Sequence, residues 1–401
     1  MKRKIGSAAA CLLAIAASPS FAKDIPVAAG AGAQERLQEA LIVAQPGDVV
    51  MLGAGKFDLT DGLSLDVANV TVKGAGPDAS VLSFAGQLAA GEGLLVTSDN
   101  VVLRDFAVED SKGDAIKSKG ADNIVYHNLR VEWTGGPKET NGAYGIYPVE
   151  SENVLIDSVL VIGASDAGIY VGQSRNIIVR NSIARFNVAG IEIENSFNAD
   201  VHDNVATKNT GGILVFDLPN LPQQGGHNVR VFDNIIAEND TPNFAPKGNI
   251  VASVPSGTGI MIMANRDIEI FDNVFDGNGS SNIMVIGYRQ KYEDAKYQPS
   301  VRNVRISDNA HGKAGFAPQF AGGDMLAAAF GGSVPPIIWD GVGGNDASIV
   351  SSDDVQVLNL GLARSDQPIE TAQPTLAKLA GDAAPKLPKI VMPAAMEAAI
   401  R

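Results

Sequence analysis

Short segments of four to six residues that alternate between apolar and polar positions recur along most of the chain. Such alternation is typical of strands, and the Ile and Val that dominate the apolar positions favour strands. A Gly-Ile pair recurs in these segments at steps of 23, 22, 22, 47 and 23 residues. The pairs are Gly145-Ile146, Gly168-Ile169, Gly190-Ile191, Gly212-Ile213 and Gly259-Ile260, with Asn282-Ile283 as a variant. A period in the low twenties predicts a solenoid.

A repeat of about 22 residues has room for three short strands and three turns. The sequence therefore predicts an all-β fold, a single-stranded solenoid in the form of a parallel β-helix with three strands per coil. The step of 47 residues is interpreted as one repeat plus a longer stretch. Pro219, Pro222 and Gly225-Gly226 in that stretch indicate a protruding loop followed by a further coil.

A polar residue closes the second apolar segment of each repeat, and it is usually Asn. These positions are Asn128, Ser158, Asn181, Asn204, Asn234, Asn273 and Asn309. We interpret them as an inward ladder in which each amide bonds to the next coil, because a buried polar group without a partner is costly.

The two ends of the solenoid need covers, because open strand edges pair with other chains. Residues 34–44 place Leu37, Ala40, Leu41 and Ala44 at helical spacing, which predicts an N-terminal capping helix within a segment spanning 23–44. The β-helix domain is predicted over 45–364. Residues 365–401 are rich in Ala, Pro and Lys with little periodicity, and are predicted to form a loosely ordered tail.

Residues 1–22 combine a basic start, an apolar run and small residues near position 22. That pattern predicts a cleavable signal peptide, and therefore a periplasmic or secreted protein. The apolar run is shorter than the roughly 20 residues of a membrane span, so no membrane span is expected. The single Cys, Cys11, lies within this run, which leaves the mature chain without disulfides.

The chain is acidic, with 31 Lys+Arg against 45 Asp+Glu and a net charge of −14. Removing residues 1–22 takes away three basic residues, which gives 28 − 45 = −17. Because nucleic-acid binding requires a basic face, this charge argues against a nucleic-acid partner.

Since Ile points inward, the residue after it points outward, and stacked coils align these residues about 4.8 Å apart. The resulting column is Lys117, Tyr147, Tyr170, Glu192, Leu214, Met261 and Met284, and the column two residues on is Lys119, Val149, Gly172, Glu194, Phe216, Met263 and Ile286. Tyr rings stack on sugar faces, while Lys and Glu supply charge and proton transfer. The first half of this face predicts a saccharide groove, and an ordinary solvated strand face is the alternative.

Eight residues are the candidates for this groove. The catalytic candidates are Lys117, Tyr144, Tyr147 and Glu192, and the substrate-binding candidates are Lys119, Asp166, Tyr170 and Glu194. Repulsion between Glu192 and Glu194 on one strand face would raise a pKa enough for an acid role, unless the pair is simply solvated. The wall of the groove is expected to consist of Tyr144, Asp166, Glu150 and the insertion with Trp133 and Lys138.

The apolar half of the face has two interpretations. Met261, Met263 and Met284 are soft ligands for Cu(I), or they are covered by another segment, for which 325–330 is a ready candidate. The four His residues lie in separate coils without ligand spacing, which argues against a His metal cluster. No cofactor is predicted, and Ca²⁺ is considered only as a bridge to a polyanion beside Lys112, Lys117 and Lys119.

These repeats resemble the right-handed parallel β-helix superfamily of carbohydrate-active proteins, which includes pectate lyases, polygalacturonases and mannuronan C5-epimerases. The likeness covers roughly residues 45–310. The segment Tyr144-Gly145-Ile146-Tyr147-Pro148-Val149-Glu150 looks like the catalytic segment of the epimerases. In that family an Asp and a His flank the Pro, where this chain has Tyr147 and Val149. The family's further catalytic Asp would fall near Gly172, so it is missing from this chain too.

A closer likeness is to a bacterial family of exported β-helix repeat proteins of uncharacterised function, often encoded beside a second exported protein. It rests on 163–174, 190–196, 211–219, Asn243-Phe244-Ala245-Pro246 and Ile337-Ile338-Trp339-Asp340-Gly341. This resemblance implies a fold and export but no reaction.

Two hypotheses follow. In the first, the exported protein binds and modifies a polysaccharide; as a lyase or epimerase it would use Lys117 to neutralise a carboxylate and Tyr144 or Tyr147 to move a proton. In the second, it is a non-catalytic scaffold for another exported protein, with contacts through 218–227 and 288–299. The latter segment contains Tyr288, Arg289, Tyr292 and Tyr297, residue types that anchor interfaces.

Overall fold

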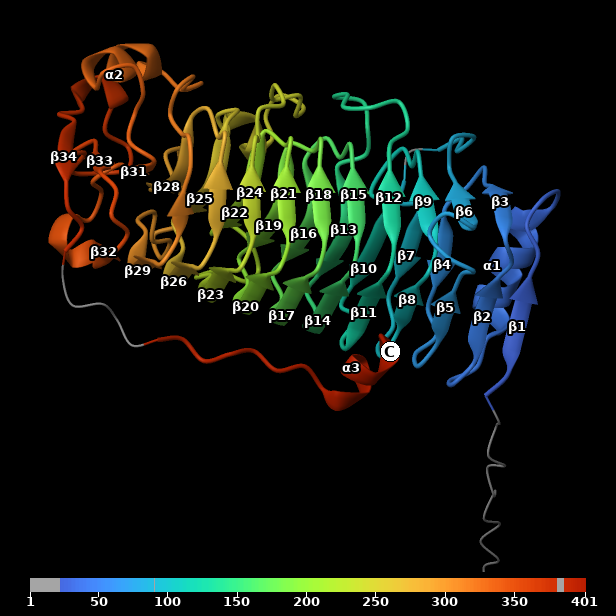
Figure 1. Cartoon of the computed structure of the whole chain (residues 1–401). Coiled ribbons are helices and arrows are strands. Elements are labelled where there is room, and N and C mark those ends of the chain that lie inside the picture. Colours follow the sequence, from blue (N-terminus) through green and yellow to red (C-terminus); the bar gives the residue numbers. More distant parts are fainter. Residues whose placement is uncertain (1–21, 90, 381–385) are drawn as a thin grey trace, which may run out of the picture.

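The chain winds through three long sheets in turn, so that each coil adds one strand to each sheet (Figure 1). The structure is a computed structural model that describes residues 22–89, 91–380 and 386–401. Strands of successive coils pair in parallel and in register, as β13 does with β16 and β16 with β19. The predicted parallel β-helix with three strands per coil is confirmed. The predicted signal peptide lies outside the described residues, apart from Ala22.

The strands are numbered along the chain. Sheet 1 contains β1 (Asp24–Val27), β2 (Val49–Leu52), β5 (Thr71–Lys73), β8 (Val102–Arg104), β11 (Ile124–His127), β14 (Glu152–Asp157), β17 (Arg175–Arg180), β20 (Phe197–His202), β23 (His227–Phe232), β26 (Arg266–Phe271), β29 (Arg302–Ser307) and β32 (Ile349–Ser351). Sheet 2 contains β3 (Gly55–Asp58), β6 (Ser80–Ser83), β9 (Ala107–Glu109), β12 (Arg130–Glu132), β15 (Leu160–Ile162), β18 (Ile183–Arg185), β21 (Val205–Thr207), β24 (Ile235–Ala237), β27 (Val274–Asp276) and β30 (Ala310–His311). Sheet 3 contains β4 (Leu63–Leu65), β7 (Leu94–Val96), β10 (Ile116–Lys119), β13 (Tyr144–Val149), β16 (Ala167–Gly172), β19 (Ala189–Glu194), β22 (Gly211–Phe216), β25 (Thr258–Met263), β28 (Ser281–Ile286), β31 (Ile337–Trp339), β33 (Val357–Asn359) and β34 (Thr375–Ala377).

The main core lies inside the coils, where apolar side chains of the three sheets meet. The Ile of each Gly-Ile pair points into it, and the same inward position of sheet 3 is Ile in successive coils. These fully buried residues are Ile116, Ile146, Ile169, Ile191, Ile213, Ile260, Ile283 and Ile337. Because stacked strands are about 4.8 Å apart, identical side chains in register form a continuous apolar column.

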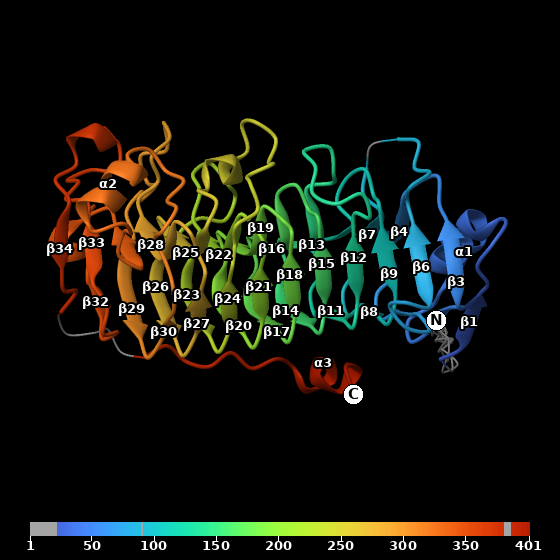
Figure 2. The ribbon, with the colours of Figure 1, turned by 45° about the horizontal axis from the view of Figure 1, so that its top comes forward.

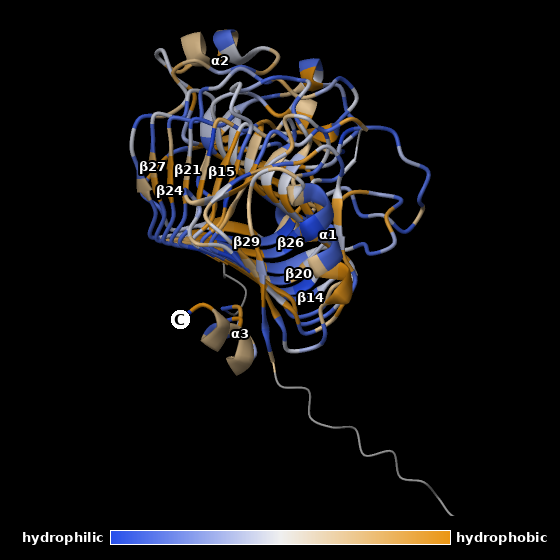
Figure 3. Ribbon diagram, turned by 90° about the vertical axis from the view of Figure 1, so that its right-hand side faces the viewer, coloured by the Kyte–Doolittle hydropathy of each residue, from blue (hydrophilic) through white to orange (hydrophobic). Residues whose placement is uncertain are grey.

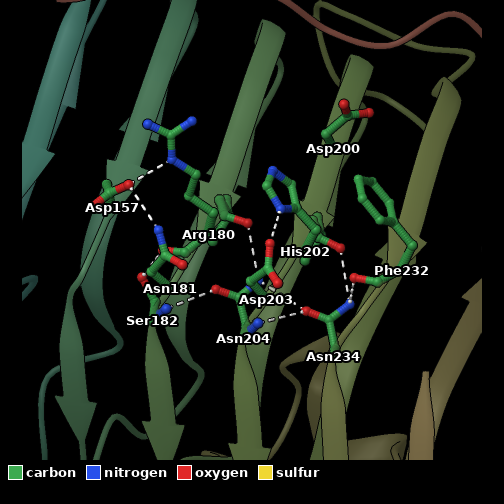
Figure 4. A network of polar contacts seen from close by, with 12 residues as sticks. Asp157, Arg180, Asn181, Ser182, Asp200, His202, Asp203, Asn204, Phe232 and Asn234 are labelled. Atoms are coloured by element: carbon green, nitrogen blue, oxygen red, sulfur yellow. Dashed lines mark hydrogen bonds and ion pairs between the residues drawn. The ribbon is translucent and has the colours of Figure 1, made fainter. Parts of the chain in front are cut away.

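The predicted Asn ladder is confirmed in its later half, of which Figure 4 shows Asn204 and Asn234. The Oδ1 atom of each Asn accepts both the backbone N–H and the side-chain N–H of the Asn one coil earlier, at 2.9–3.1 Å. The residues are Asn204, Asn234, Asn273 and Asn309.

For Asn128, Ser158 and Asn181 the ladder prediction is wrong. These residues stand one position earlier in the turn, with left-handed φ values of 50°, 58° and 52°. Asn181 donates instead to Asp157, and Ser182 takes the ladder position, its N–H donating to Asn204 Oδ1 at 3.0 Å. Asn suits both neighbouring positions, one for its amide and the other for its tolerance of positive φ, so the pattern did not separate them.

The 47-residue step holds no further coil, which corrects the sequence interpretation. Ile213 pairs directly with Ile260, so β22 and β25 belong to successive coils. The additional residues lie in two excursions, 217–226 and 238–257. Figure 2 shows the second of them, in yellow, rising beside β22 and β25.

The predicted capping helix is α1 (Ala33–Val43), which lies across the first end of the stack (Figure 3). It contacts β1, β3 and β4, the first strands of the three sheets. Leu37 and Leu41 of α1 are buried in the main core. The other helices are α2 (Gly323–Ala329), α3 (Ala394–Ala399), η1 (Ile250–Ser253), η2 (Gly344–Ala347) and η3 (Ile369–Thr371). No helix in the described part of the chain is long and apolar enough to cross a membrane.

The C-terminal segment returns along the stack. At its beginning, β34 pairs antiparallel with β33. Residues 386–401 then run beside sheet 1 and end in α3, near β11 (Figure 1). The described part of the segment predicted as a tail therefore carries the strand β34, the short 3-10 helix η3 and the helix α3.

Candidate functional site

The two predicted outward columns of sheet 3 are confirmed by the strand register. The pairs that establish it include Lys117 with Tyr147, Tyr170 with Glu192, and Leu214 with Met261. The order from basic through aromatic and acidic to apolar therefore exists on one face.

The apolar half of this face is covered and forms a second core outside the coils. Met261, Met263 and Met284 are buried there beside Phe216 and Ile338. Ala327 of α2 belongs to the same cluster, with Leu326 and Phe330 packed against it, so the predicted cover by 325–330 is confirmed. Among the described residues, no group of three or more His, Cys, Asp or Glu side chains is arranged to hold a metal ion.

Lys117 marks the open end of the face. Its Nζ lies 3.2 Å from Glu92 Oε1, 3.3 Å from Asp114 Oδ2 and 4.7 Å from the centre of the Tyr147 ring. Partial burial alone would lower the pKa of Lys117, but the negative charges of Asp114 and Glu92 raise it overall. The lysine is therefore charged and already paired with two carboxylates.

Lys119 and Glu150 extend the open end. Their charged atoms lie 3.8 Å apart, and both side chains are exposed. A hollow of about 430 Å³ opens beside this pair. It is lined by Asp122, Glu150, Ser151, Glu152, Gln173, Arg175, Pro222 and Gln223.

Three tyrosines form a cluster next to Lys117. The ring centres of Tyr144 and Tyr147 are 4.5 Å apart, those of Tyr144 and Tyr170 are 4.5 Å apart, and those of Tyr147 and Tyr170 are 4.9 Å apart. Gly172 makes room for the ring of Tyr170, because a Cβ at that position would lie 2.4 Å from a ring carbon. Tyr170 is buried, whereas Tyr144 and Tyr147 are partly accessible.

Three carboxyl groups lie behind the tyrosines, and we call Asp166, Glu192 and Glu194 the acid cluster. Burial raises the pKa of Asp166 and of Glu194 to about 7 each. Burial, reinforced by the charges of Glu194 and Asp166, raises the pKa of Glu192 well above its usual value. The Tyr170 hydroxyl donates to Glu194 at 2.6 Å, whereas both carboxyl oxygens of Glu192 are buried without a hydrogen-bond partner.

The excursion 238–257 covers the acid cluster. Val251 and Val254 belong to the second core, and the Asn249 side chain donates to Asp166 at 2.9 Å. The excursion holds its own shape, because Asn243 donates to the carbonyls of Val251 and Val254. The groove predicted from the sequence is thus open at Lys117, Lys119 and Tyr147 and closed over the acid cluster.

The structure brings all eight predicted site residues to one patch on β10, β13, β16, β19 and the turn before β16. Two surrounding expectations are wrong. Trp133 is not in a groove wall; it is buried in the main core, where its Nε1–H donates to the Ser111 carbonyl. Tyr288 and Tyr297, expected at a protein interface, are buried in the second core, and Tyr297 donates to the Asp217 carbonyl at 2.5 Å.

Residues 64–220 match the family model described as "Right handed beta helix region". Together with the three parallel sheets, this match decides the architecture. The chain is a right-handed parallel β-helix. No curated protein matches the sequence.

Solved structures similar to this β-helix have low sequence identity to it. The A-module of the mannuronan C-5 epimerase AlgE4 of Azotobacter vinelandii has a TM-score of 0.46 and 13% identity, covering 71% of this chain and 85% of that chain. Endopolygalacturonase I of Stereum purpureum has a TM-score of 0.46 and 14% identity, covering 72% and 95%. The pectate lyase Pel9A has a TM-score of 0.42 and 13% identity, covering 75% and 80%.

Three residues of the β-helix site were not found from the sequence. Asp114 lies three residues before Lys117 in the chain, and Glu92 lies in the coil before it. A search for acidic residues near each outward Lys, in its own coil and in the coil before, would have found both. Asn249 lies 83 residues from its partner Asp166, within an excursion that has no repeat pattern. No signal in the sequence connects the two.

Proposed function

We propose that this β-helix protein binds a polysaccharide at the open end of the sheet 3 face and modifies it by proton transfer. The observation that carries the proposal is the tyrosine cluster, which stands between Lys117 and the acid cluster. Partly accessible rings offer faces for sugar stacking. Two carboxyl groups with pKa values of about 7 are present in both protonation states at neutral pH, so one can donate a proton while the other accepts one.

The charges of the open end favour a neutral polysaccharide. Lys117 and Lys119 carry two positive charges, and Glu92, Asp114 and Glu150 carry three negative ones, which gives 2 − 3 = −1. The whole chain is also acidic, at −14. A lyase or epimerase acting on a uronate would need Lys117 to exchange its two carboxylates for that of the substrate.

Binding and chemistry depend on different residues and can be tested separately. Replacing Tyr147 by Ala is expected to weaken binding of the cognate neutral glycan about 5- to 150-fold, because it removes an accessible stacking ring. Lys73→Ala, an exposed change on sheet 1, is the matched control and should bind as the wild type does. The measurement is a glycan array followed by titration calorimetry.

The chemistry is tested with Glu194→Gln, which keeps an oxygen acceptor for Tyr170 but cannot release a proton. We expect the variant to bind the glycan and to lose product formation, followed by chromatography of the treated polymer. Unchanged product formation would remove the acid cluster from the mechanism. Unchanged affinity in Tyr147→Ala would contradict the binding site itself.

A further inference from the structure

The outer face of sheet 1 carries an apolar row where solvent-facing strands normally carry polar residues. Val125, Leu155 and Ile178 occupy the same outward position in three successive coils. The row continues into charged residues, with Asp200 paired to Arg230 one coil later. We call the row the sheet 1 track, and its members are Val125, Leu155, Ile178, Asp200, Arg230 and Glu269.

The C-terminal segment lies along the charged half of the track. The backbone N–H of Leu387 donates to Glu269 at 3.2 Å, and that of Ile390 donates to Asp200 at 3.1 Å. Glu269 and Asp200 are two coils apart, about 9.6 Å at the strand spacing of a sheet. Three residues of extended chain span about 10 Å. The two carboxylates therefore match two backbone N–H groups three residues apart in an extended peptide, a contact that does not involve its side chains.

The apolar half of the track receives side chains of the same segment. Met392 and Met396 form with Val125, Leu155 and Ile178 a cluster that is separate from the main core. Beyond them, Arg180 forms an ion pair with Glu397 at 2.8 Å. Methionine side chains adapt to irregular apolar surfaces. The apolar half of the track therefore requires apolar side chains at these two positions of the bound segment, and their exact shape matters less.

Residues 386–401 contribute no side chain to the main core inside the coils. The main core is closed by the three sheets and α1, and the track residues all point away from it. A hollow of about 340 Å³ remains where the segment begins. Its walls include Asp267, Glu269 and Asn303, with Lys386 and Leu387 on the other side. The sheet carboxylates already pair with arginines, Glu269 with Arg305 and Asp200 with Arg230. The segment adds backbone N–H groups to these two ion pairs.

We propose that the sheet 1 track is a peptide-recognition surface and that residues 386–401 are its resident occupant. The partner it fits is a protein that presents an extended segment followed by two methionines and a glutamate at the spacing of Met392, Met396 and Glu397. Because the resident segment is tethered, its effective concentration is on the order of millimolar. A partner in solution must therefore displace it.

The test uses a labelled synthetic peptide of residues 386–401, with the full chain and a chain ending at residue 380 as receptors. We expect the shortened chain to keep its cooperative thermal transition and to bind the peptide at least 10-fold more tightly than the full chain does. The matched control peptide carries Met392→Ser and Met396→Ser and should bind at least 10-fold more weakly. Fluorescence anisotropy measures the binding.

Three outcomes would overturn the proposal. Loss of the thermal transition in the shortened chain would make residues 386–401 part of the folded core. A shortened chain that does not bind the peptide at millimolar concentration would exclude a recognition surface. Dimers of the full chain that disappear on removing 386–401 would assign the track to exchange of this segment between two copies.

Discussion

At the scale of single residues, the acid cluster is a feature that costs folding free energy, because it buries three carboxyl groups. Burial raises the pKa of all three carboxyl groups of the acid cluster, and the charge of Asp166 adds to the rise at Glu192 and Glu194. Among the described residues, no ion pair of a lysine or arginine with these three groups is formed. Burial of a carboxyl group favours its protonated form, because the charged form loses its hydration. The folded protein therefore holds protons here that the unfolded chain would release.

Proton binding of this kind makes stability depend on pH with a defined sign. Between about pH 4, where unfolded carboxyls titrate, and the raised pKa values of the cluster, the folded state binds more protons than the unfolded state does. The free energy of unfolding therefore falls as pH rises through this window. For Asp166 and Glu194 the loss is complete a little above pH 7.

Glu192→Gln should reduce this dependence on pH. The amide has the size of the carboxyl and does not titrate, and any cost of burying it is equal at both pH values. We expect the difference in free energy of unfolding between pH 5 and pH 8 to become smaller than in the wild type, measured by urea titration at both pH values. Glu139→Gln, an exposed change, is the control and should leave the difference unaltered. An unaltered difference in Glu192→Gln would mean that this carboxyl is ionised in the folded protein.

At the scale of elements, the turn between sheet 1 and sheet 2 shows how far repeat patterns reach. The repeat period predicted the coils. The inward Ile and the outward columns then followed, because successive side chains of a strand point to opposite faces. It did not separate the ladder position of Asn204 from the left-handed position of Asn181, because both favour Asn. It also missed a second ladder, Asn187, Asn209, Asn239 and Asn278, at the turn before sheet 3.

The two Asn positions should differ in their contribution to stability. Asn234→Ala removes the acceptor of two N–H groups of Asn204 and leaves both buried without partners, so it is expected to cost about 2–3 kcal/mol. Asn181→Gly keeps the left-handed turn and should cost less than about 1 kcal/mol. Chemical denaturation of the two variants side by side measures this. Equal losses would mean that the ladder contributes no more than the turn.

At the scale of the whole molecule, periodic and non-periodic parts were predicted with different success. The coils and the inward and outward columns of sheet 3 could be placed from the sequence, including the patch that unites Lys117, Tyr147 and Glu192. The Asn ladders, which also repeat, were placed only in part. The capping helix α1 and the cover at 325–330 were also predicted. The covers that contain Asn249 and Met392 were not, because no sequence pattern joins either residue to its partner. A cover decides whether solvent reaches Glu192. The sequence predicted an open groove at this residue, whereas in the structure its carboxyl oxygens are buried.

The covers at the ends of the stack also govern association between molecules. Helix α1 contacts β1, β3 and β4, so it blocks the first strand of every sheet from pairing with another chain. Replacing both Leu37 and Leu41 by Asp places two charges in the main core and should detach the helix. We expect soluble oligomers that grow with concentration, measured by light scattering, with the sheets still intact by circular dichroism. Ile42→Asp changes a side chain on the exposed face of the same helix and should stay monomeric. A monomeric double variant would mean that the first coil is protected by its own twist and charge and not by α1.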